Sequence, residues 1–347
     1  MGYTIRSSEK TSSSASEMET KALLHLLCED GANGNIIGFA IDFFNDVTGM
    51  DRNALRLYDI QSKGTDSGPS ALGQELVTLY KNYISEFKKF FVAQILFVRR
   101  VTRPVLGDQV LTEFRYCDMT EAAQIKLRSS FVQMCEDKTY IDNAFLDDEV
   151  IDAFLDQVLF VVAKPDKEDY IRPLIKTNNA LGTTDRDLRA IFAEIRIKQL
   201  GIKTSSKVEG LELKSPFEAF SSGRFLRRSD IELLVISRVL NRNPLKAGVP
   251  KPFESIYNGF EEDYAEEMLE GCQNDLAKQM FTTPEAPAFW KLLSDIVTAI
   301  KNDPDKGAEE IYREIPLSTL DGCRQMDALS HQYFISIVKE GLKIDKD

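Results

Sequence analysis

Histidine and cysteine are scarce in this chain of 347 residues. It contains only two histidines, His25 and His331, and five widely scattered cysteines. With so few histidines, we expect neither a histidine-based metal site nor a Ser-His-Asp triad. No two cysteines have zinc-knuckle spacing, and we expect ordinary buried thiols rather than a disulfide framework. Chemistry in this protein must therefore rest on carboxylates, amides and lysines.

Long apolar runs are also absent. None approaches the roughly 18 apolar residues that a membrane span requires, and no apolar stretch resembling a secretory signal precedes Leu23. The composition, with 43 % hydrophobic and 28 % charged residues, is typical of globular proteins. We expect a cytoplasmic protein with no membrane contact. The Gly-rich segment at residues 64–70 reads as a loop, and it lacks the Gly-Lys-Ser/Thr of a phosphate loop, which argues against nucleotide hydrolysis.

The sequence does not show a strongly basic surface. Residues 1–104 carry 12 basic and 12 acidic side chains, whereas the remainder carries 31 basic and 43 acidic ones and accounts for the net charge of −12. Constitutive DNA binding normally needs basic residues to displace counterions from phosphates. We expect the acidic remainder to contact other proteins or to restrain the activity of the N-terminal part. Two small arginine clusters, at 99–103 and 224–228, are expected to be solvated or interdomain faces, with phosphate contact as the alternative.

The pattern of apolar residues predicts helix, strand, strand, helix and strand, in that order from Ser16. The strands are expected at 35–44, 55–63 and 91–101, the second helix at 72–90, and residues 1–15 are expected to be frayed. This order predicts an α/β domain with a mixed sheet flanked by helices. Beyond residue 165 nearly every segment has a helical pattern. We predict an α/β domain at 1–165 and a mainly α-helical domain for assembly or regulation at 166–347.

Polar side chains gather at the ends of the first two predicted strands. Alternation along the second strand places Asp59, Gln61 and Lys63 on one face, and the first strand ends in Asp42 and Asp46. Carboxylate and side-chain oxygens are the ligands that Mg²⁺ prefers, and a lysine beside the metal-bound water can orient it or stabilise the pentavalent phosphorus. These residues therefore predict a site for phosphodiester hydrolysis. The alternative is a modest surface ion pair between Asp59 and Lys63 on an edge strand.

Asp46 followed by Gln61-Ser62-Lys63 resembles the active-site motif of the PD-(D/E)xK superfamily of restriction-endonuclease-like nucleases. The resemblance covers residues 16–101 and includes the order of elements, although that superfamily usually has three strands before the crossover helix. It implies that Asp46, Gln61 and Lys63 are catalytic. It also implies an Mg²⁺ or Mn²⁺ ion bound by Asp46, Gln61 and the backbone of Ser62.

A further acid of the metal site is expected from the first helix or from the preceding strand. Glu19 matches a position where the superfamily often places an acid, and Glu17 fits nearly as well. Gln61 stands where most members have an acid, which removes one negative charge from the metal site. Asp42 is a candidate ligand that could compensate for this change, as is Asp59.

The phrase DFFNDV followed by YDIQSKG is similar to the D-QxK nucleases that act as effectors of bacterial anti-phage systems of the CBASS and Lamassu types. The C-terminal half does not resemble the cyclic-oligonucleotide sensor of CBASS nucleases, which favours a Lamassu nuclease subunit. This resemblance implies an endonuclease for double-stranded DNA, activated by homo-oligomerisation or by release from a partner. The expected partners are an SMC-like ATPase subunit and a small third subunit. The rival hypothesis is a catalytically inactive, nuclease-like adaptor that assembles a defence complex through its acidic helical domain.

Overall fold

The computed structural model describes residues 3–5, 13–31, 34–177, 182–282 and 286–342. Contacts divide the chain into two compact units, which we describe separately. Unit 1 comprises Met1–Tyr170 and Phe192–Arg228, and unit 2 comprises Ile171–Ile191 and Ser229–Asp347. Among the described residues, no helix has both the length and the apolar character needed to cross a membrane.

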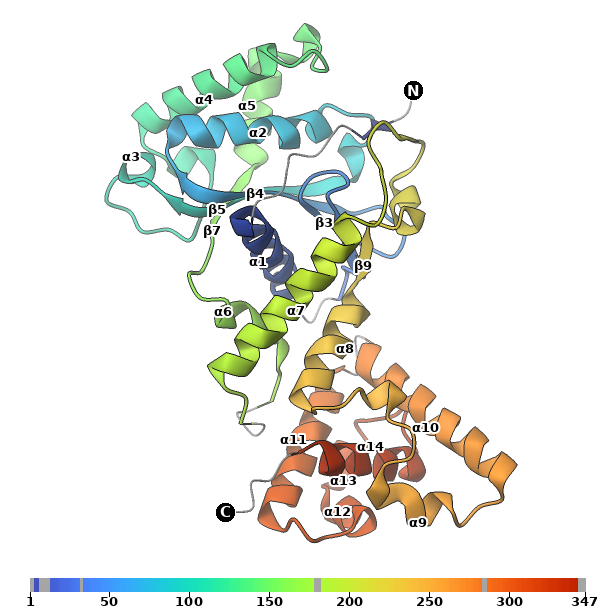
Figure 1. The fold of residues 1–347 in the computed structure, drawn as a ribbon. Coiled ribbons are helices and arrows are strands. Elements are labelled where there is room, and N and C mark those ends of the chain that lie inside the picture. The colour runs from blue at the N-terminus through green and yellow to red at the C-terminus, as the bar shows by residue number, and fades with distance from the viewer. Residues whose placement is uncertain (1–2, 6–12, 32–33, 178–181, 283–285, 343–347) are drawn as a thin grey trace. The chain divides into compact units, whose positions relative to one another are not determined.

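Unit 1 is built on a seven-stranded mixed sheet with the strand order β6-β7-β5-β4-β3-β2-β9 (Figure 1). Strands β4, β5 and β7 run parallel to one another, and the other pairings are antiparallel. The strands are β2 (Gly38–Ile41), β3 (Val47–Met50), β4 (Leu57–Ser67), β5 (Phe91–Val101), β6 (Glu113–Phe114), β7 (Leu159–Val162) and β9 (Phe225–Arg227). A second, two-stranded sheet pairs β1 (Tyr3–Thr4) with β8 (Glu212–Leu213).

Helices cover both faces of the seven-stranded sheet. Helix α1 (Ser13–Asp30) contacts β3, β4 and β5, whereas α2 (Pro69–Tyr83) packs on β4 and β5 from the other side (Figure 1). A second layer, α4 (Glu121–Glu136), packs on α2. The remaining helices that lie wholly in this unit are α3 (Arg103–Leu106) and α5 (Asp148–Gln157). Helix α6 (Glu168–Ile171) lies in it up to Tyr170, and α7 (Asp185–Lys203) contributes its residues from Phe192 onward.

Burial explains why β5 could be recognised so clearly. Its central residues Leu96, Phe97 and Val98 are all fully buried, so successive side chains are apolar on both faces of the sheet. The predicted strand at 91–101 coincides with β5. The predicted mixed sheet flanked by helices, followed by a helical C-terminal region, is confirmed at this level of detail.

Three local predictions around the sheet are wrong. The helix expected at 72–90 ends at Tyr83, and a separate 3-10 helix follows at Lys88–Phe90. The segment 35–44 was expected to be one strand, but β2 ends at Ile41 and the chain turns at Asp42, whose φ is +49°. A separate strand, β3, follows, so three strands of the seven-stranded sheet precede α2. The loop predicted at 64–70 is also wrong, because β4 continues to Ser67 through a register shift after Lys63. Pairing with the end of β5 keeps this polar segment extended, an effect that local composition does not reveal.

Two further predictions are wrong because the segments concerned contain short strands. Residues 1–15 were expected to be frayed, but Tyr3–Thr4 forms β1, and Tyr3 and Ile5 are buried. The part of this prediction that concerns 6–12 lies outside the described residues. The region after 165, expected to be almost entirely helical, contains β8 and β9. Both strands are held by partners more than a hundred residues earlier in the chain, so their own sequences give little signal.

Unit 2 is helical in the part that the structure describes. Its buried core includes Trp290, Leu293 and Phe334, which confirms the predicted core position of the single tryptophan. After α7, its helices are α8 (Arg228–Val239, from Ser229 onward), α9 (Glu254–Tyr257), α10 (Glu262–Phe281), α11 (Ala286–Asn302), α12 (Ala308–Glu314), α13 (Leu317–Leu320) and α14 (Ala328–Gly341).

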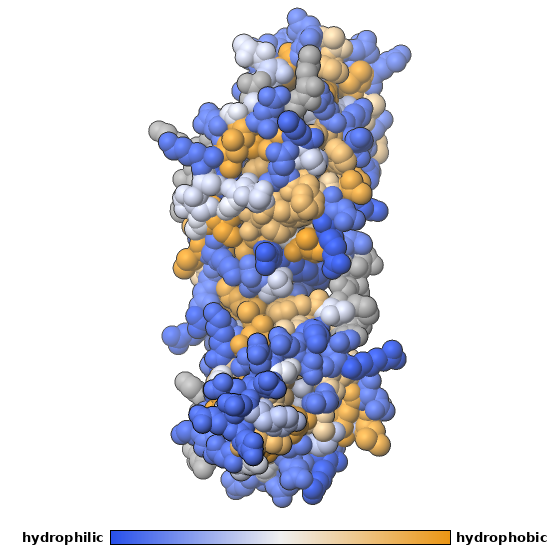
Figure 2. All heavy atoms as spheres, turned by 90° about the vertical axis from the view of Figure 1, so that its right-hand side faces the viewer, coloured by the Kyte–Doolittle hydropathy of each residue, from blue (hydrophilic) through white to orange (hydrophobic). Residues whose placement is uncertain are grey.

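Apolar residues reach the surface only in places. The face drawn in Figure 2 is mainly hydrophilic, with smaller apolar patches between the polar residues. Three of the cysteines, Cys135, Cys272 and Cys323, are buried as expected, but Cys117 is exposed. Cys28 is half-buried, so the prediction of buried thiols is wrong for Cys117 and is not fully met at Cys28.

Candidate functional site

Asp46 lies directly before β3, at the end of the turn that begins with Asp42. The backbone N–H of Asp42 donates to the carbonyl oxygen of Asp46 at 3.0 Å, which closes this turn. The Asp46 carboxylate then contacts β4: its Oδ2 accepts hydrogen bonds from the backbone N of Ser62 at 2.8 Å and from Ser62 Oγ at 2.7 Å. The structure thus brings together two of the residues predicted from the motif.

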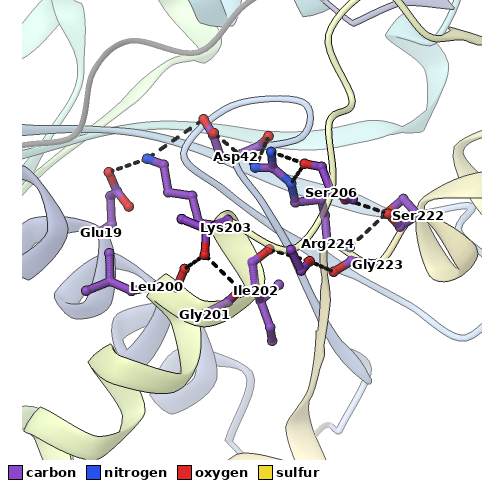
Figure 3. A network of polar contacts seen from close by, with 12 residues as sticks. Glu19, Asp42, Leu200, Gly201, Ile202, Lys203, Ser206, Ser222, Gly223 and Arg224 are labelled. Carbon is purple, nitrogen blue, oxygen red and sulfur yellow. Dashed lines mark hydrogen bonds and ion pairs between the residues drawn. The ribbon is translucent and has the colours of Figure 1, made fainter.

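Glu19 on α1 belongs to the same polar region. Its buried carboxylate lies 3.0 Å from the Lys203 ammonium, which reaches it from the last residue of α7 (Figure 3). Lys203 Nζ is also 3.9 Å from Asp42 Oδ1. Glu17, the alternative candidate, pairs instead with Lys167 at 2.9 Å and Lys21 at 3.5 Å. The structure therefore favours Glu19 over Glu17 as the acid beside Asp46.

The pKa values of these acids show how closely the negative charges are placed. Burial and then the nearby Glu19 carboxylate raise the pKa of Asp46 to about 7, although Ser62 and Lys203 oppose the shift. Burial also raises the pKa of Glu19, against the lowering effect of Lys203. A pKa of about 7 means that Asp46 is partly protonated at neutral pH, and a cation beside the two acids would favour its ionised form.

Asp42 is held by Arg224, which precedes β9. Arg224 Nη1 lies 3.1 Å from Asp42 Oδ2, and its Nε donates to the carbonyl oxygen of Ser206 at 2.9 Å (Figure 3). Arg224 is only 7 % exposed and its partners belong to unit 1, so the expected solvated or interdomain face is wrong for this residue. Arg228 also has a structural partner, Asp30, at 2.6 Å. At the other arginine cluster, Arg99 pairs with Asp66 at 3.0 Å on the surface.

The side chains of Gln61 and Lys63 lie on the opposite side of β4 from Asp46, Ser62 and Glu19. Thr78 Oγ1 donates to Gln61 Oε1 at 3.0 Å, and the Lys63 ammonium forms an ion pair with Glu75. Thr78 and Glu75 both belong to α2, whereas Glu19 belongs to α1 on the other face of the sheet (Figure 1). The structure therefore separates the five motif residues into two groups, with Gln61 and Lys63 on the α2 side and Asp46, Ser62 and Glu19 on the α1 side.

Asp59 has a structural role in this arrangement. It is fully buried, and its carboxylate accepts hydrogen bonds from Thr48 at 2.8 Å, from Asn82 at 2.7 Å and from Asn45. Burial raises the pKa of Asp59 to about 6. Strand β4 lies between β3 and β5 rather than at an edge. The alternative interpretation of Asp59 and Lys63 as a surface ion pair on an edge strand is therefore wrong, whereas the shared face of Asp59, Gln61 and Lys63 is confirmed.

Sequence reasoning missed three residues that determine the electrostatics of this region: Glu75, Lys203 and Arg224 in its role at Asp42. Within the described part of the chain, no three His, Cys, Asp or Glu side chains are grouped so as to hold a metal ion. A cation here would therefore have to be bound by two carboxylates together with neutral oxygens. Comparisons with protein-family models, curated proteins and solved structures found no match to the chain.

Proposed function

We propose that unit 1 is a metal-dependent nuclease of the restriction-endonuclease-like type, which cuts double-stranded DNA. The observation that carries this proposal is the order α1-β2-β3-β4-α2-β5, in which the motif residues lie on successive elements. Glu19 is on α1, Asp46 directly precedes β3, and Gln61-Ser62-Lys63 lies on β4. The resemblance calls for three strands before the crossover helix, and β2, β3 and β4 supply them.

A hard divalent cation, Mg²⁺ or Mn²⁺, fits the chemistry of the α1 side. The carboxylates of Glu19 and Asp46 would hold it, and the Ser62 backbone is a further candidate oxygen donor, whereas the Asp42 carboxylate is paired with Arg224. The Lys203 ammonium already stands beside Glu19 as a stand-in for such a cation. When bound, the ion would acidify a water molecule and shield the charge that develops on the phosphate.

Lys63 is proposed to orient the attacking water or to stabilise the pentavalent phosphorus. The structure places its side chain, 34 % exposed and paired with Glu75, on the α2 side of β4, so for this role Lys63 would have to turn toward Glu19 and Asp46 on the α1 side. Glu75 would be the residue that sets the resting position of Lys63. Gln61 would have to leave Thr78 to serve as a metal ligand, so we place it second to Glu19 in that role.

The biological setting of the proposal comes from the resemblance and from the charge distribution. A neutral N-terminal part joined to a strongly acidic remainder favours a nuclease that works within an assembly, because the acidic part repels phosphates. We propose an effector of anti-phage defence of the Lamassu type. It would be active as an oligomer or upon release by a complex containing an SMC-like ATPase and a small third subunit.

A specific observation also favours the inactive adaptor as a second candidate. Glu19 and Lys63 both have an oppositely charged partner within the protein, Lys203 and Glu75 respectively. In a protein without catalysis, such pairs would serve only to stabilise the fold.

Plasmid cleavage tests the two candidates. We expect Mg²⁺- or Mn²⁺-dependent nicking that EDTA abolishes and that Asp46→Asn removes. Asp66→Asn makes the same change on the exposed end of β4 and should leave the activity intact. Absence of metal-dependent cleavage by both the isolated chain and its assembled form would establish the adaptor instead.

A further inference from the structure

We propose that Lys203 competes with a divalent cation for the carboxylates of Glu19 and Asp46, so that the end of α7 restrains metal binding. The inference rests on the proposed function, because it concerns the regulation of the same site. It assigns to α7 a role that no motif in the sequence indicates.

The Lys203 ammonium lies beside two largely buried carboxylates, those of Glu19 and Asp42. Its Nζ is 3.0 Å from Glu19 Oε1 and 3.9 Å from Asp42 Oδ1. The side chains of Lys203, Glu19 and Asp42 are 9 %, 4 % and 10 % exposed, respectively. Charges interact more strongly where water is largely excluded. A metal ion and the Lys203 ammonium, both positive, would therefore repel each other strongly if both lay beside Glu19.

Arg224 makes this competition selective for Glu19 and Asp46. Its guanidinium pairs with Asp42 and with the carbonyl oxygen of Ser206, and it belongs to a different segment from Lys203 (Figure 3). When Lys203 is displaced, Arg224 therefore still neutralises the charge of Asp42. Glu19 loses its ion-pair partner at the same time, and Glu19 and Asp46 remain as the two carboxylates available to a cation.

The seam between α7 and α1 is suited to reversible release. Arg196 donates to Ser16 Oγ at 2.9 Å, and Thr20 Oγ1 donates to Gln199 Oε1 at 2.8 Å. Thr20 Oγ1 also lies 3.0 Å from the carbonyl oxygen of Ser16, and its single proton can serve only one of the two acceptors. The Gln199 amide has one buried polar atom without a hydrogen-bond partner among the described residues. The seam is therefore held by side-chain contacts that can open when the end of α7 moves away.

Calorimetric titration with Mn²⁺ of the full-length chain tests the proposal without reference to catalysis. We expect Lys203→Met to bind Mn²⁺ about tenfold or more tightly than the wild type, because removal of the ammonium removes the competing cation. Lys207→Met makes the same change at an exposed residue and should leave the affinity unchanged. The double variant Glu19→Gln, Lys203→Met should lose the gain in affinity.

Equal Mn²⁺ affinity of folded Lys203→Met and the wild type would overturn the proposal. If Lys203→Met does not fold, hydrogen–deuterium exchange of the wild type decides. Saturating Mn²⁺ should accelerate amide exchange in residues 199–203, and unchanged exchange there would overturn the inference. Tighter Mn²⁺ binding by a protein that never cuts DNA would instead refute the nuclease function alone.

Discussion

Asp46 and Ser62 are joined by two hydrogen bonds to a single carboxylate oxygen, Oδ2, one from the backbone N and one from Oγ of Ser62. This double contact ties the turn before β3 to the middle of β4. It also favours the ionised form of Asp46, which is opposed by burial and by Glu19. The balance between these effects sets the protonation of the proposed metal ligand near neutral pH.

Ser62→Ala should raise the pKa of Asp46 above its value of about 7. The substitution removes the hydroxyl donor, and a hydrogen bond to the charged form of an acid lowers its pKa. Titration of the carboxyl carbons by NMR in EDTA measures this shift, with Ser85→Ala as a remote control. An unchanged midpoint for Asp46 would show that the backbone N–H of Ser62 alone supports the charge.

Lys63→Ala should reduce plasmid nicking about 100-fold or more, which is the usual cost of losing a group that stabilises transition-state charge. Its effect on the free energy of unfolding should stay within about 1 kcal/mol, because the pair with Glu75 is partly exposed. Both quantities are measured on the same preparation. Full nicking activity in a folded Lys63→Ala variant would remove Lys63 from the mechanism.

Glu75→Gln tests whether Glu75 positions the Lys63 ammonium for its proposed catalytic role. It leaves Lys63 present but without its ion-pair partner in α2, so we expect a smaller loss of activity than in Lys63→Ala. Release of the ammonium from Glu75 should also change the dependence of the rate on pH. A pH–rate profile identical to that of the wild type would assign Glu75 a purely structural role.

The sequence predicted a secondary-structure element correctly where its apolar pattern extends over one long, continuous segment. The predicted strand at 91–101 corresponds to β5, since its first eight residues are apolar except for Gln94. The face shared by Asp59, Gln61 and Lys63 followed from alternation alone. In contrast, the strand β3 has only four residues, and its separation from β2 depends on the left-handed turn at Asp42.

The site could be predicted only in part because its charges are balanced by residues distant in sequence. Glu19 and Lys203 are 184 positions apart, and Asp42 and Arg224 are 182 apart. Neither cation has a local pattern that reveals its partner. Alternation along β4 placed Gln61 and Lys63 on one face, but it could not show that this face meets α2 rather than α1.

Gly73→Ala should lower the free energy of unfolding by about 2 kcal/mol or more. A Cβ at Gly73 would overlap the carbonyl oxygen of Leu127 and lie 3.0 Å from the backbone N of Phe131, where α2 meets α4. Backbone atoms cannot move aside as a flexible side chain can, so the two helices must separate. Chemical denaturation measures the change.

Gly201→Ala provides the matched control for Gly73. Gly201 also lies within a helix, α7, but nothing would lie within 4 Å of its added Cβ. Alanine is favoured over glycine in a helix by up to about 1 kcal/mol. The same substitution should therefore stabilise the protein at one position and destabilise it at the other. Equal effects at both positions would contradict the close contact between α2 and α4.

Asp59→Ala should destabilise the fold by about 3 kcal/mol or more. The substitution leaves the amides of Asn45 and Asn82 and the hydroxyl of Thr48 without their shared acceptor in a buried region. Asp66→Ala, at the exposed end of the same strand, should change stability by no more than about 0.5 kcal/mol. Similar small effects for the two variants would show that water replaces the Asp59 carboxylate at little cost.

His331 should make the stability of unit 2 depend on pH. Its Nδ1 lies 2.6 Å from the carbonyl oxygen of Asp327, which can only accept a hydrogen bond. The neutral ring therefore carries its proton on Nδ1, and its buried Nε2 has no partner among the described residues. Burial lowers the pKa of His331, because protonation would place a charge and an unpaired donor in the interior.

A lowered pKa means that the unfolded chain binds this proton more readily than the folded one. The contribution of His331 is therefore fully present above the unfolded value of about 6.5, and it is lost as the pH falls below that value, at up to about 1.4 kcal/mol per pH unit. His331→Leu removes the titration while keeping an apolar side chain of similar size. Urea unfolding of both proteins at several pH values, followed by fluorescence of Trp290 in the same unit, measures the difference. The wild type should lose stability relative to the variant as the solution becomes acidic, and parallel curves for the two proteins would show that His331 is protonated at no cost in the fold.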